Sequence, residues 1–219
     1  MESTKQFTFT DNDNELSVII PEYVDPKYGM YTWPCAPVLA QYIWMNRHII
    51  KTKRVLEIGA GTALPGIVAA KCGADVILSD SSFLVECQKN CIKSCEANHL
   101  VNIPVVGITW GAFDPSLLEL GSTDIILASD CFYETKDFED VLVIISYILQ
   151  RNNDCQFWCT YQERSADRSI RHLLNKWGLQ SLPIPLEEFG ANIPNIAGSS
   201  LPGSHTINMY IITREIPVG

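Results

Sequence analysis

The pattern of apolar and polar residues along this chain switches repeatedly between two periods. Short, mainly apolar runs at 55–58, 76–78 and 125–128 are bounded by turn-forming residues, which is typical of strands buried in a parallel sheet. Other stretches, such as 38–43, place apolar residues at helical spacing. Because strands and helices alternate through the middle of the chain, the pattern predicts a doubly wound α/β fold with an antiparallel finish.

The predicted elements follow one another in a regular order. Strands are expected at 55–58, 76–80, 104–108, 124–130, 156–161 and 206–213, and helices at 33–43, 67–71, 83–96, 138–150 and 165–177. Gly178 ends the last helix, since glycine suits the left-handed conformation found there. The stretch between Gly178 and residue 206 contains four prolines and is expected to be loop.

The first 24 residues predict a separate β-hairpin. Alternating residues at 7–9 and 16–20 flank the turn-forming run 11–14. The remaining residues, 25–219, are expected to form one domain, because a chain of 219 residues suffices for one well-buried α/β core and is too short for two ordinary ones.

Composition narrows the class of protein. Apolar residues make up 47% and charged residues 19%, which is typical of a soluble globular protein. No apolar run reaches the roughly 18 residues of a membrane span, and the polar start lacks a signal-peptide core, so the protein is expected inside the cell and off the membrane. A formal charge of −9 argues against direct nucleic-acid binding and favours a basic partner.

The eight cysteines are expected to be reduced thiols, because no secretion signal precedes them. Cys87, Cys91 and Cys95 repeat every four residues, with His99 four further on. On a helix they share one face, but Cys87 and Cys95 would lie about 12 Å apart, too far to share one tetrahedral ion. No metal site is therefore expected.

The stretch 55–66 indicates a cofactor site. Glu57 lies in the strand, Gly59 and Gly61 form a turn, and a helix follows, so the backbone can approach a ligand closely at a helix N-terminus. Asp80 ends the next strand about twenty residues later, where a carboxylate is placed to hold ribose hydroxyls. The turn and this acid together predict a nucleotide-like cofactor.

The glycine spacing separates two classes of cofactor. A dinucleotide turn has a third glycine where this chain has Leu64, whereas an S-adenosylmethionine turn has an acid followed by Gly-x-Gly, as here. A nicotinamide oxidoreductase is the rival interpretation, and it also expects a Tyr-x-x-x-Lys pair. Tyr161 is followed four positions on by Ser165, so S-adenosylmethionine is favoured.

Further candidates lie where strands end. Asp130 closes the strand at 124–130, at the edge where open parallel sheets bind ligands. Trp33 and Trp110 each have two interpretations, a ring that covers the cofactor or an ordinary core aromatic. Arg164 likewise has more than one interpretation: it lines a substrate mouth, pairs with Glu163 or caps a neighbouring helix.

The order and spacing of these motifs resemble the methyltransferase-like family 16 group of seven-strand methyltransferases. The motifs are WPCAPVLA at 33–40, LEIGAGTALPG at 56–66, LSD at 78–80, TWG at 109–111 and DCFY at 130–133, and the match covers about residues 30 to 215. The resemblance implies a Rossmann-like seven-strand sheet and S-adenosylmethionine as cofactor.

The resemblance also implies roles for particular residues. Cofactor contacts are expected at Trp33, Glu57, Gly59, Ala60, Gly61, Asp80, Ser81, Trp110 and Ser129. Asp130 and Tyr133 form the Asp-x-x-Tyr signature beside the transferred methyl group and are the expected catalytic residues. Glu134, Tyr161 and Arg164 are expected to bind substrate. His205, in a motif-like loop, stays outside the catalytic set.

A protein substrate follows from the same resemblance. Most of the family resemble lysine methyltransferases, but the runs 125–132, 160–162 and 201–206 are most similar to a branch associated with arginine methylation of histone H3. Histone H3 arginine is therefore the expected target and a lysine of a non-histone protein the alternative. Location in nucleus and cytoplasm is expected, with chaperones or transcription regulators as further partners.

Two observations keep other interpretations open. The glutamate pair with which well-known arginine methyltransferases hold a guanidinium is not found after Asp130, and the carboxylates available are Asp130, Glu134 and Glu163. A cofactor-binding adaptor without turnover is an alternative from a different class, although intact acids at 57, 80 and 130 weigh against it.

Overall fold

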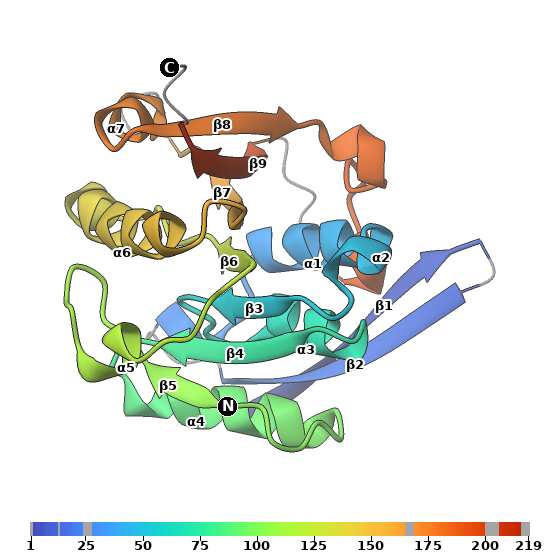
Figure 1. The fold of residues 1–219 in the computed structure, drawn as a ribbon. Helices are drawn as coiled ribbons and strands as arrows, with labels where there is room; N and C mark the ends of the chain where they lie inside the picture. The colour runs from blue at the N-terminus through green and yellow to red at the C-terminus, as the bar shows by residue number, and fades with distance from the viewer. Residues whose placement is uncertain (1, 13, 24–27, 165–168, 200–205, 216–219) are drawn as a thin grey trace.

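The computed structural model describes residues 2–12, 14–23, 28–164, 169–199 and 206–215. Its centre is a seven-stranded sheet in the order β5-β4-β3-β6-β7-β9-β8 (Figure 1). The strands are β3 (Arg54–Glu57), β4 (Asp75–Asp80), β5 (Val105–Gly107), β6 (Ile125–Ser129), β7 (Gln156–Gln162), β8 (Leu179–Ile184) and β9 (Ile207–Arg214). The predicted α/β fold with seven strands is confirmed.

The chain reverses direction across the sheet between β3 and β6. It runs outward through β4 and β5, then returns to β6 and β7, and these five strands are parallel. Strand β9 pairs antiparallel with both β7 and β8. In open α/β sheets, such a reversal opens a crevice at the carboxyl ends of the strands, where ligands bind.

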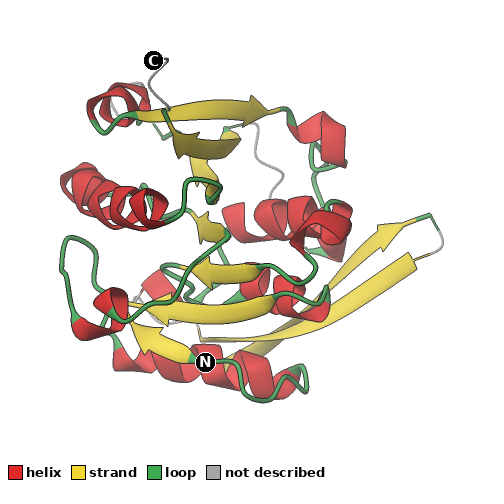
Figure 2. Ribbon diagram, in the orientation of Figure 1, coloured by secondary structure: helices red, strands yellow, loops and turns green. Residues whose placement is uncertain are grey.

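Helices cover both faces of the sheet (Figure 2). They are α1 (Cys35–Met45), α2 (Arg47–Ile50), α3 (Leu64–Lys71), α4 (Val85–Ala97), α5 (Pro115–Leu118), α6 (Phe138–Arg151) and α7 (Arg171–Lys176), with 3-10 turns at Tyr28–Met30, Thr135–Asp137, Leu186–Phe189 and Ile196–Gly198. Side chains alternate along each strand, so Ile125 and Leu127 pack with α1 and α3 while Ile126 packs with α6. Two hydrophobic cores result, one on each face.

Strand β8 was missed by the sequence analysis, which expected loop after Gly178. Proline rarely occurs inside a sheet because it has no N–H to donate. Here Pro183 lies opposite Tyr210 in a strand at the edge of the sheet, so it has a neighbouring strand on one side only. The short helices α2 and α5 were missed as well, because four residues are too few to show helical spacing.

The N-terminal hairpin is confirmed and forms its own two-stranded sheet. Strands β1 (Glu2–Asp11) and β2 (Asn14–Tyr23) pair antiparallel and extend to the right in Figure 1. The hairpin is attached to the end of α4: the backbone N–H of Ile19 donates to Asn98 Oδ1 at 3.0 Å, and Asn98 Nδ2 donates back to the Ile19 carbonyl at 2.6 Å.

Three further expectations concern the undescribed residues, metal binding and membrane spans. The motif at 201–205 and residues 165–168 of the predicted last helix lie outside the described residues. Cys87, Cys91 and Cys95 are buried on α4, and no group of three or more potential metal ligands gathers among the described residues. None of the described helices is both long and apolar enough to span a membrane.

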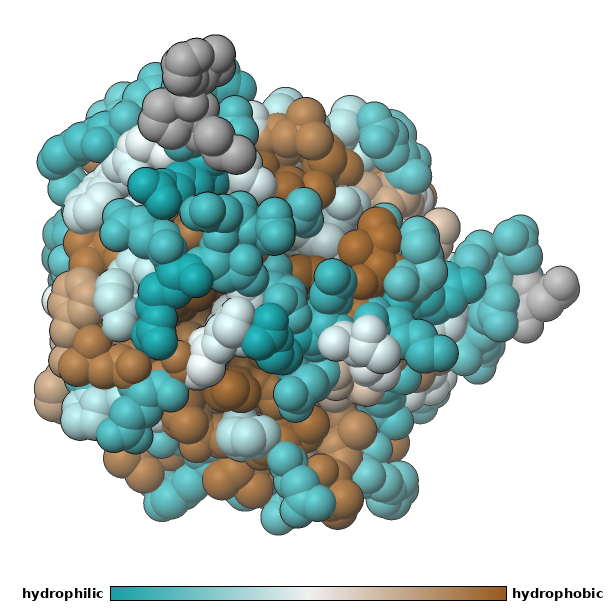
Figure 3. Space-filling view, in the orientation of Figure 1, coloured by the Kyte–Doolittle hydropathy of each residue, from teal (hydrophilic) through white to brown (hydrophobic). Residues whose placement is uncertain are grey.

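The surface mixes hydrophilic and hydrophobic residues, as the space-filling view shows (Figure 3). Phe83 and Val101 are the most exposed large apolar side chains among the described residues, at 84% and 78%. In sequence, Phe83 precedes α4 and Val101 follows it.

Candidate active site

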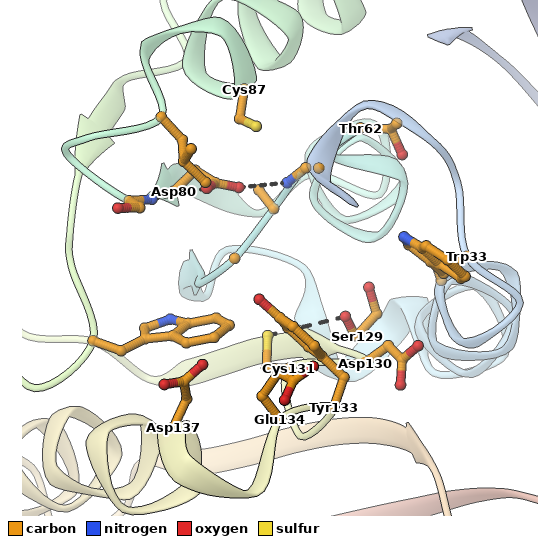
Figure 4. Close-up of a pocket in the computed structure, with 18 of the residues that line it drawn as sticks. Trp33, Thr62, Asp80, Cys87, Ser129, Asp130, Cys131, Tyr133, Glu134 and Asp137 are labelled. Atoms are coloured by element: carbon orange, nitrogen blue, oxygen red, sulfur yellow. Dashed lines mark hydrogen bonds between the residues drawn. The ribbon is translucent and has the colours of Figure 1, made fainter. Parts of the chain in front are cut away.

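A cavity of about 730 Å³ opens at the carboxyl ends of β3, β4 and β6. Its walls come from the glycine turn after β3, the ends of β4 and β6, the turn after β5, and the segment 29–33 before α1 (Figure 4). Its volume is within the range of small-molecule and cofactor sites. The reversal of strand order therefore places a ligand-sized cavity where the sequence analysis placed the cofactor.

The glycine turn needs both of its glycines. Gly59 and Gly61 have φ angles of +57° and +54°, which a residue with a Cβ rarely adopts. A Cβ at Gly59 would lie 2.8 Å from Cys131 Sγ and 2.9 Å from the Trp110 ring. Because glycine has no Cβ, the turn can lie close to Cys131 and Trp110 and still leave room for a ligand.

Asp80 holds the glycine turn and faces the cavity (Figure 4). Its Oδ2 accepts a hydrogen bond from Gly61 N at 2.9 Å, and its Oδ1 accepts one from Ser81 N at 2.8 Å. Burial raises the pKa of this carboxyl above its ordinary value, while the two backbone N–H groups oppose the rise. Since each carboxylate oxygen has a further lone pair, Asp80 can still accept hydrogen bonds from ribose hydroxyls.

Both tryptophans with two open interpretations line the cavity. Trp33 is 38% exposed and meets the ring of Tyr31 edge to face, with the centroids 5.5 Å apart. Trp110 packs on the α6-side core with one part of its ring and meets Tyr133 with centroids 6.2 Å apart. Both rings therefore border the cavity, and Trp110 packs against the core as well.

Asp130 forms a two-point ion pair with Arg164. Arg164 Nη2 donates to Asp130 Oδ2 at 2.7 Å and Nη1 donates to Oδ1 at 3.1 Å. Asp130 itself has a φ of +56°, and its backbone N–H donates to the Thr160 carbonyl at 2.7 Å. The two side-chain hydrogen bonds to Asp130 raise the pKa of the Arg164 guanidinium above its ordinary value. Arg164 lines the cavity, and its expected alternative partner, Glu163, instead accepts a 3.5 Å hydrogen bond from Asn208.

The turn after β6 brings further polar groups to the cavity. Tyr133, Glu134 and Asp137 all line it, and burial raises the pKa of the Tyr133 phenol to about 12, so that it stays protonated. The carboxylates of Glu134 and Asp137 form no ion pair or side-chain hydrogen bond with another described residue. This arrangement leaves negative charge available at one side of the cavity.

Two of the predicted site residues, Glu57 and Tyr161, lie in the core and do not line the cavity. Glu57 is fully buried beneath α3, where its Oε2 accepts a hydrogen bond from Gly66 N at 2.9 Å and its Oε1 has no partner among the described residues. Burial raises its pKa to about 8. Tyr161 is 1% exposed and stacks on Tyr210, with centroids 6.0 Å apart. Both lie on strands at positions that point into a core rather than out of the sheet edge.

The other predicted site residues come together around the cavity. They are Trp33, Gly59, Ala60, Gly61, Asp80, Ser81, Trp110, Ser129, Asp130, Tyr133, Glu134 and Arg164. The sequence analysis missed Tyr31, Thr62, Thr109 and the acids Asp137 and Asp140. Thr62 and Thr109 lie inside quoted motifs, and Tyr31 and Asp137 lie close to one, which is the signal that could have found them.

Several solved structures that share the fold carry methyltransferase names. A putative RNA methyltransferase of Pyrococcus horikoshii aligns with a TM-score of 0.60 over 89% of this chain and 93% of that one, at 15% identity. The Thermus thermophilus 16S rRNA methyltransferase RsmC, determined with AdoMet and guanosine, aligns with a TM-score of 0.59 over 97% and 51%, at 14% identity. At these identities the likeness concerns the fold alone.

The fold and the cavity, with its glycine turn and Asp80, define an S-adenosylmethionine-dependent methyltransferase. The chain belongs to the lysine methyltransferase family, whose model matches residues 12–176. Relatives named Histone-arginine methyltransferase METTL23 are 53% identical in Xenopus laevis, over 93% of this chain and 87% of that one, and 54% identical in Homo sapiens, over 84% and 97%. Protein N-lysine methyltransferase METTL21A of Danio rerio is 27% identical over 83% and 82%. The family resemblance seen in the motifs is confirmed, with S-adenosylmethionine as cofactor and protein methylation as reaction class.

Proposed function

We propose that this enzyme methylates an arginine of histone H3. Relatives that share about half of its residues carry the name histone-arginine methyltransferase, and they match most of the chain. The structural observation that carries the proposal is the pair of carboxylates, Glu134 and Asp137, which line the cavity without an ion pair to another described residue. A cationic acceptor would pair with this uncompensated negative charge.

The cavity divides into two ends in this proposal. The glycine turn, Asp80 and Trp110 would hold the cofactor, with Asp80 accepting from ribose hydroxyls and the indole covering a flat ring. In Figure 4, Glu134 and Asp137 lie on the opposite side of the view from Asp80. When bound, S-adenosylmethionine supplies an electrophilic methyl group on its sulfonium. The protein's own contribution is orientation, exclusion of water and charge at the acceptor.

The ion pair of Asp130 refines the expected role of that residue. Arg164 already balances the charge of Asp130 through an ion pair, so Glu134 and Asp137 are the better placed carboxylates for an incoming guanidinium. A planar guanidinium forms its strongest contacts with carboxylates through paired N–H groups. We therefore assign substrate binding to Glu134 and Asp137. Asp130 and Arg164 together shape the adjoining wall of the cavity. Tyr133 borders the acceptor as a neutral phenol and does not act as a base, and burial raises its pKa further.

The test is a methylation assay with labelled S-adenosylmethionine and core histones, followed by peptide mass spectrometry. We expect label on an arginine of histone H3, reduced at least about tenfold in the double variant Glu134→Gln/Asp137→Asn, because charged hydrogen bonds of this kind contribute about 1.5–3 kcal/mol each. Glu119→Gln, an exposed acid on the far end of α5 that does not line the cavity, is the matched control.

Three results would change the proposal. Label on lysine would keep the enzyme class and overturn the arginine specificity. Lysine is the second candidate because of the family description and the METTL21A relative. Equal labelling by the double variant would remove Glu134 and Asp137 from the acceptor site. Binding of S-adenosylhomocysteine without transfer to any histone or extract protein would favour the adaptor.

A histone substrate also sets an expectation for location. We propose that the enzyme works in the nucleus as well as the cytoplasm, because its substrate would be encountered in both compartments. Imaging of the tagged full chain tests this proposal, and a signal confined to the cytoplasm would contradict it.

A further inference from the structure

Glu22 is a buried acid that belongs to the N-terminal hairpin and touches the segment beside the cofactor cavity. The side chain is 1% exposed, near the end of β2. Its Oε1 accepts a hydrogen bond from the backbone N–H of Thr32 at 3.0 Å, and its Oε2 pairs with Lys5 Nζ at 2.9 Å. A buried carboxylate is costly unless it is paired, and both of its oxygens are paired here.

Thr32 continues this chain of contacts to the glycine turn. Its hydroxyl and that of Thr62 share a hydrogen bond of 3.0 Å, and both side chains are buried. Thr62 lies directly after Gly61 and lines the cavity. The neighbours of Thr32 in sequence, Tyr31 and Trp33, line the cavity as well. Thr32 is therefore held from the hairpin on one side and holds the cofactor turn on the other.

Lys5 provides a second contact between the hairpin and the same segment. Its Nζ lies 4.4 Å from the centroid of the Tyr31 ring while it pairs with Glu22. A cation over an aromatic face is attracted by the ring, so Lys5 fixes Tyr31 in place. Tyr31 in turn packs edge to face on Trp33. Hairpin residues thus contact the cavity segment through both a backbone amide and an aromatic ring.

We propose that Glu22 is a positioning residue for the S-adenosylmethionine site and that the hairpin is a working part of that site. The Glu22 link, made of Lys5, Glu22, Thr32 and Thr62, holds segment 31–33 against the glycine turn. Cofactor binding uses the cavity walls in one arrangement, and walls held in advance lose less freedom on binding. Loss of the link weakens cofactor binding while the groups that contact the acceptor stay in place.

The test measures S-adenosylhomocysteine binding to the full chain by calorimetry for Glu22→Gln and Thr32→Val. Glutamine keeps the acceptor for Thr32 N but turns a donor toward Lys5, and valine removes only the hydroxyl that reaches Thr62. We expect the dissociation constant to rise about fivefold or more in each, which is the effect of one lost hydrogen bond. The matched controls are Glu15→Gln and Thr4→Val, at exposed positions on the two strands of the hairpin. Their dissociation constants should stay within about twofold of the wild-type value.

Two further readouts separate positioning from general stability. Hydrogen exchange should become faster for the peptide containing 59–64 and stay unchanged for the peptide containing 125–129. In turnover assays, KM for S-adenosylmethionine should rise while kcat at saturating cofactor stays within about twofold.

Unchanged cofactor binding in both folded variants would overturn the proposal, as would a fall in kcat without a change in binding. If Glu22→Gln does not fold, Thr32→Val decides alone, because it leaves the buried ion pair intact.

Discussion

The guanidinium of Arg164 holds both carboxylate oxygens of Asp130, at 2.7 Å and 3.1 Å, across 34 positions of sequence. Asp130 follows β6 and Arg164 follows the neighbouring parallel strand β7, so the pair fastens two adjacent strand ends at the cavity. The side chain of Asp130 is 6% exposed and that of Arg164 29%. One partner is therefore buried and depends on the other for its charge to be compensated.

We predict that Arg164→Ala lowers the free energy of unfolding by roughly 2 kcal/mol, because it leaves a buried carboxylate unpaired; the partial exposure of Arg164 keeps the loss below that of a fully buried pair. The double variant with Asp130→Asn should lose less than the sum of the two single variants. Urea denaturation of the four proteins measures this coupling, and additive losses would show that the pair does not act as a unit.

Asp80 carries the second prediction. Asp80→Ala removes the acceptor of the Gly61 and Ser81 amides and the carboxylate that faces the cavity. We expect the dissociation constant for S-adenosylhomocysteine to rise about tenfold or more, because the ribose hydroxyls lose a charged acceptor and the glycine turn loses its support. Asp75→Ala, at the exposed start of the same strand, is the control. Equal affinity in the two variants would contradict the role of Asp80.

Glu57 makes stability depend on pH. Its pKa is raised to about 8 in the folded protein by burial, whereas an unfolded glutamate titrates near 4.3. Between these two pKa values the folded state therefore keeps a proton on Glu57 that the unfolded state has released. The stability gained from this proton is full below about pH 4.3 and is lost as pH rises toward 8. The loss amounts to about 1.4 kcal/mol per pH unit at most.

Glu57→Gln should abolish this contribution while keeping an acceptor for Gly66 N. The measurement is the free energy of unfolding between pH 5 and pH 8 for both proteins. A parallel decline in the wild type and the variant would exclude Glu57 as the source.

Gly66 supplies the fourth prediction. A Cβ at this position would lie 2.4 Å from both Glu57 Oε2 and Leu78 Cδ2. Gly66→Ala should destabilise the protein by about 2 kcal/mol, because overpacking outweighs the gain of up to about 1 kcal/mol from replacing a helical glycine. Gly121→Ala, where no atom lies within 4 Å, should change the melting temperature little. A stable Gly66→Ala would mean that Glu57 can move away at little cost.

Much of the fold was predictable because its signals are local. The sequence indicates the strand–glycine–helix unit at 54–71 through its apolar residues, its two glycines and the acid at the end of the next strand. The structure places both glycines at positive φ. The hairpin likewise has alternating residues around a turn. Strand β8 gave no such signal, since Pro183 is tolerated only through its place at the sheet edge, and an edge exists only once the whole sheet has formed.

The site was predictable in its membership more than in its contacts. Asp80, Trp110 and Asp130 follow strand ends, and all strand ends of a parallel sheet meet at one edge, so their common cavity follows from order along the chain. Which atoms they contact does not follow. Arg164 was expected at the substrate mouth or in a pair with Glu163. It lines the cavity but holds Asp130, because that pairing depends on the spacing of two strand ends.

By itself the sequence determined the order of elements, the glycine turn and the class of cofactor, since these depend on residues close together in the chain. Only the tertiary structure decided that Glu57 and Tyr161 are core residues, that Asp130 is already paired, and that Glu22 bonds Thr32 beside the cavity. The physical reason is that burial and ion pairing are properties of neighbours in space. A buried charge takes whichever partner the packed elements bring within hydrogen-bond distance.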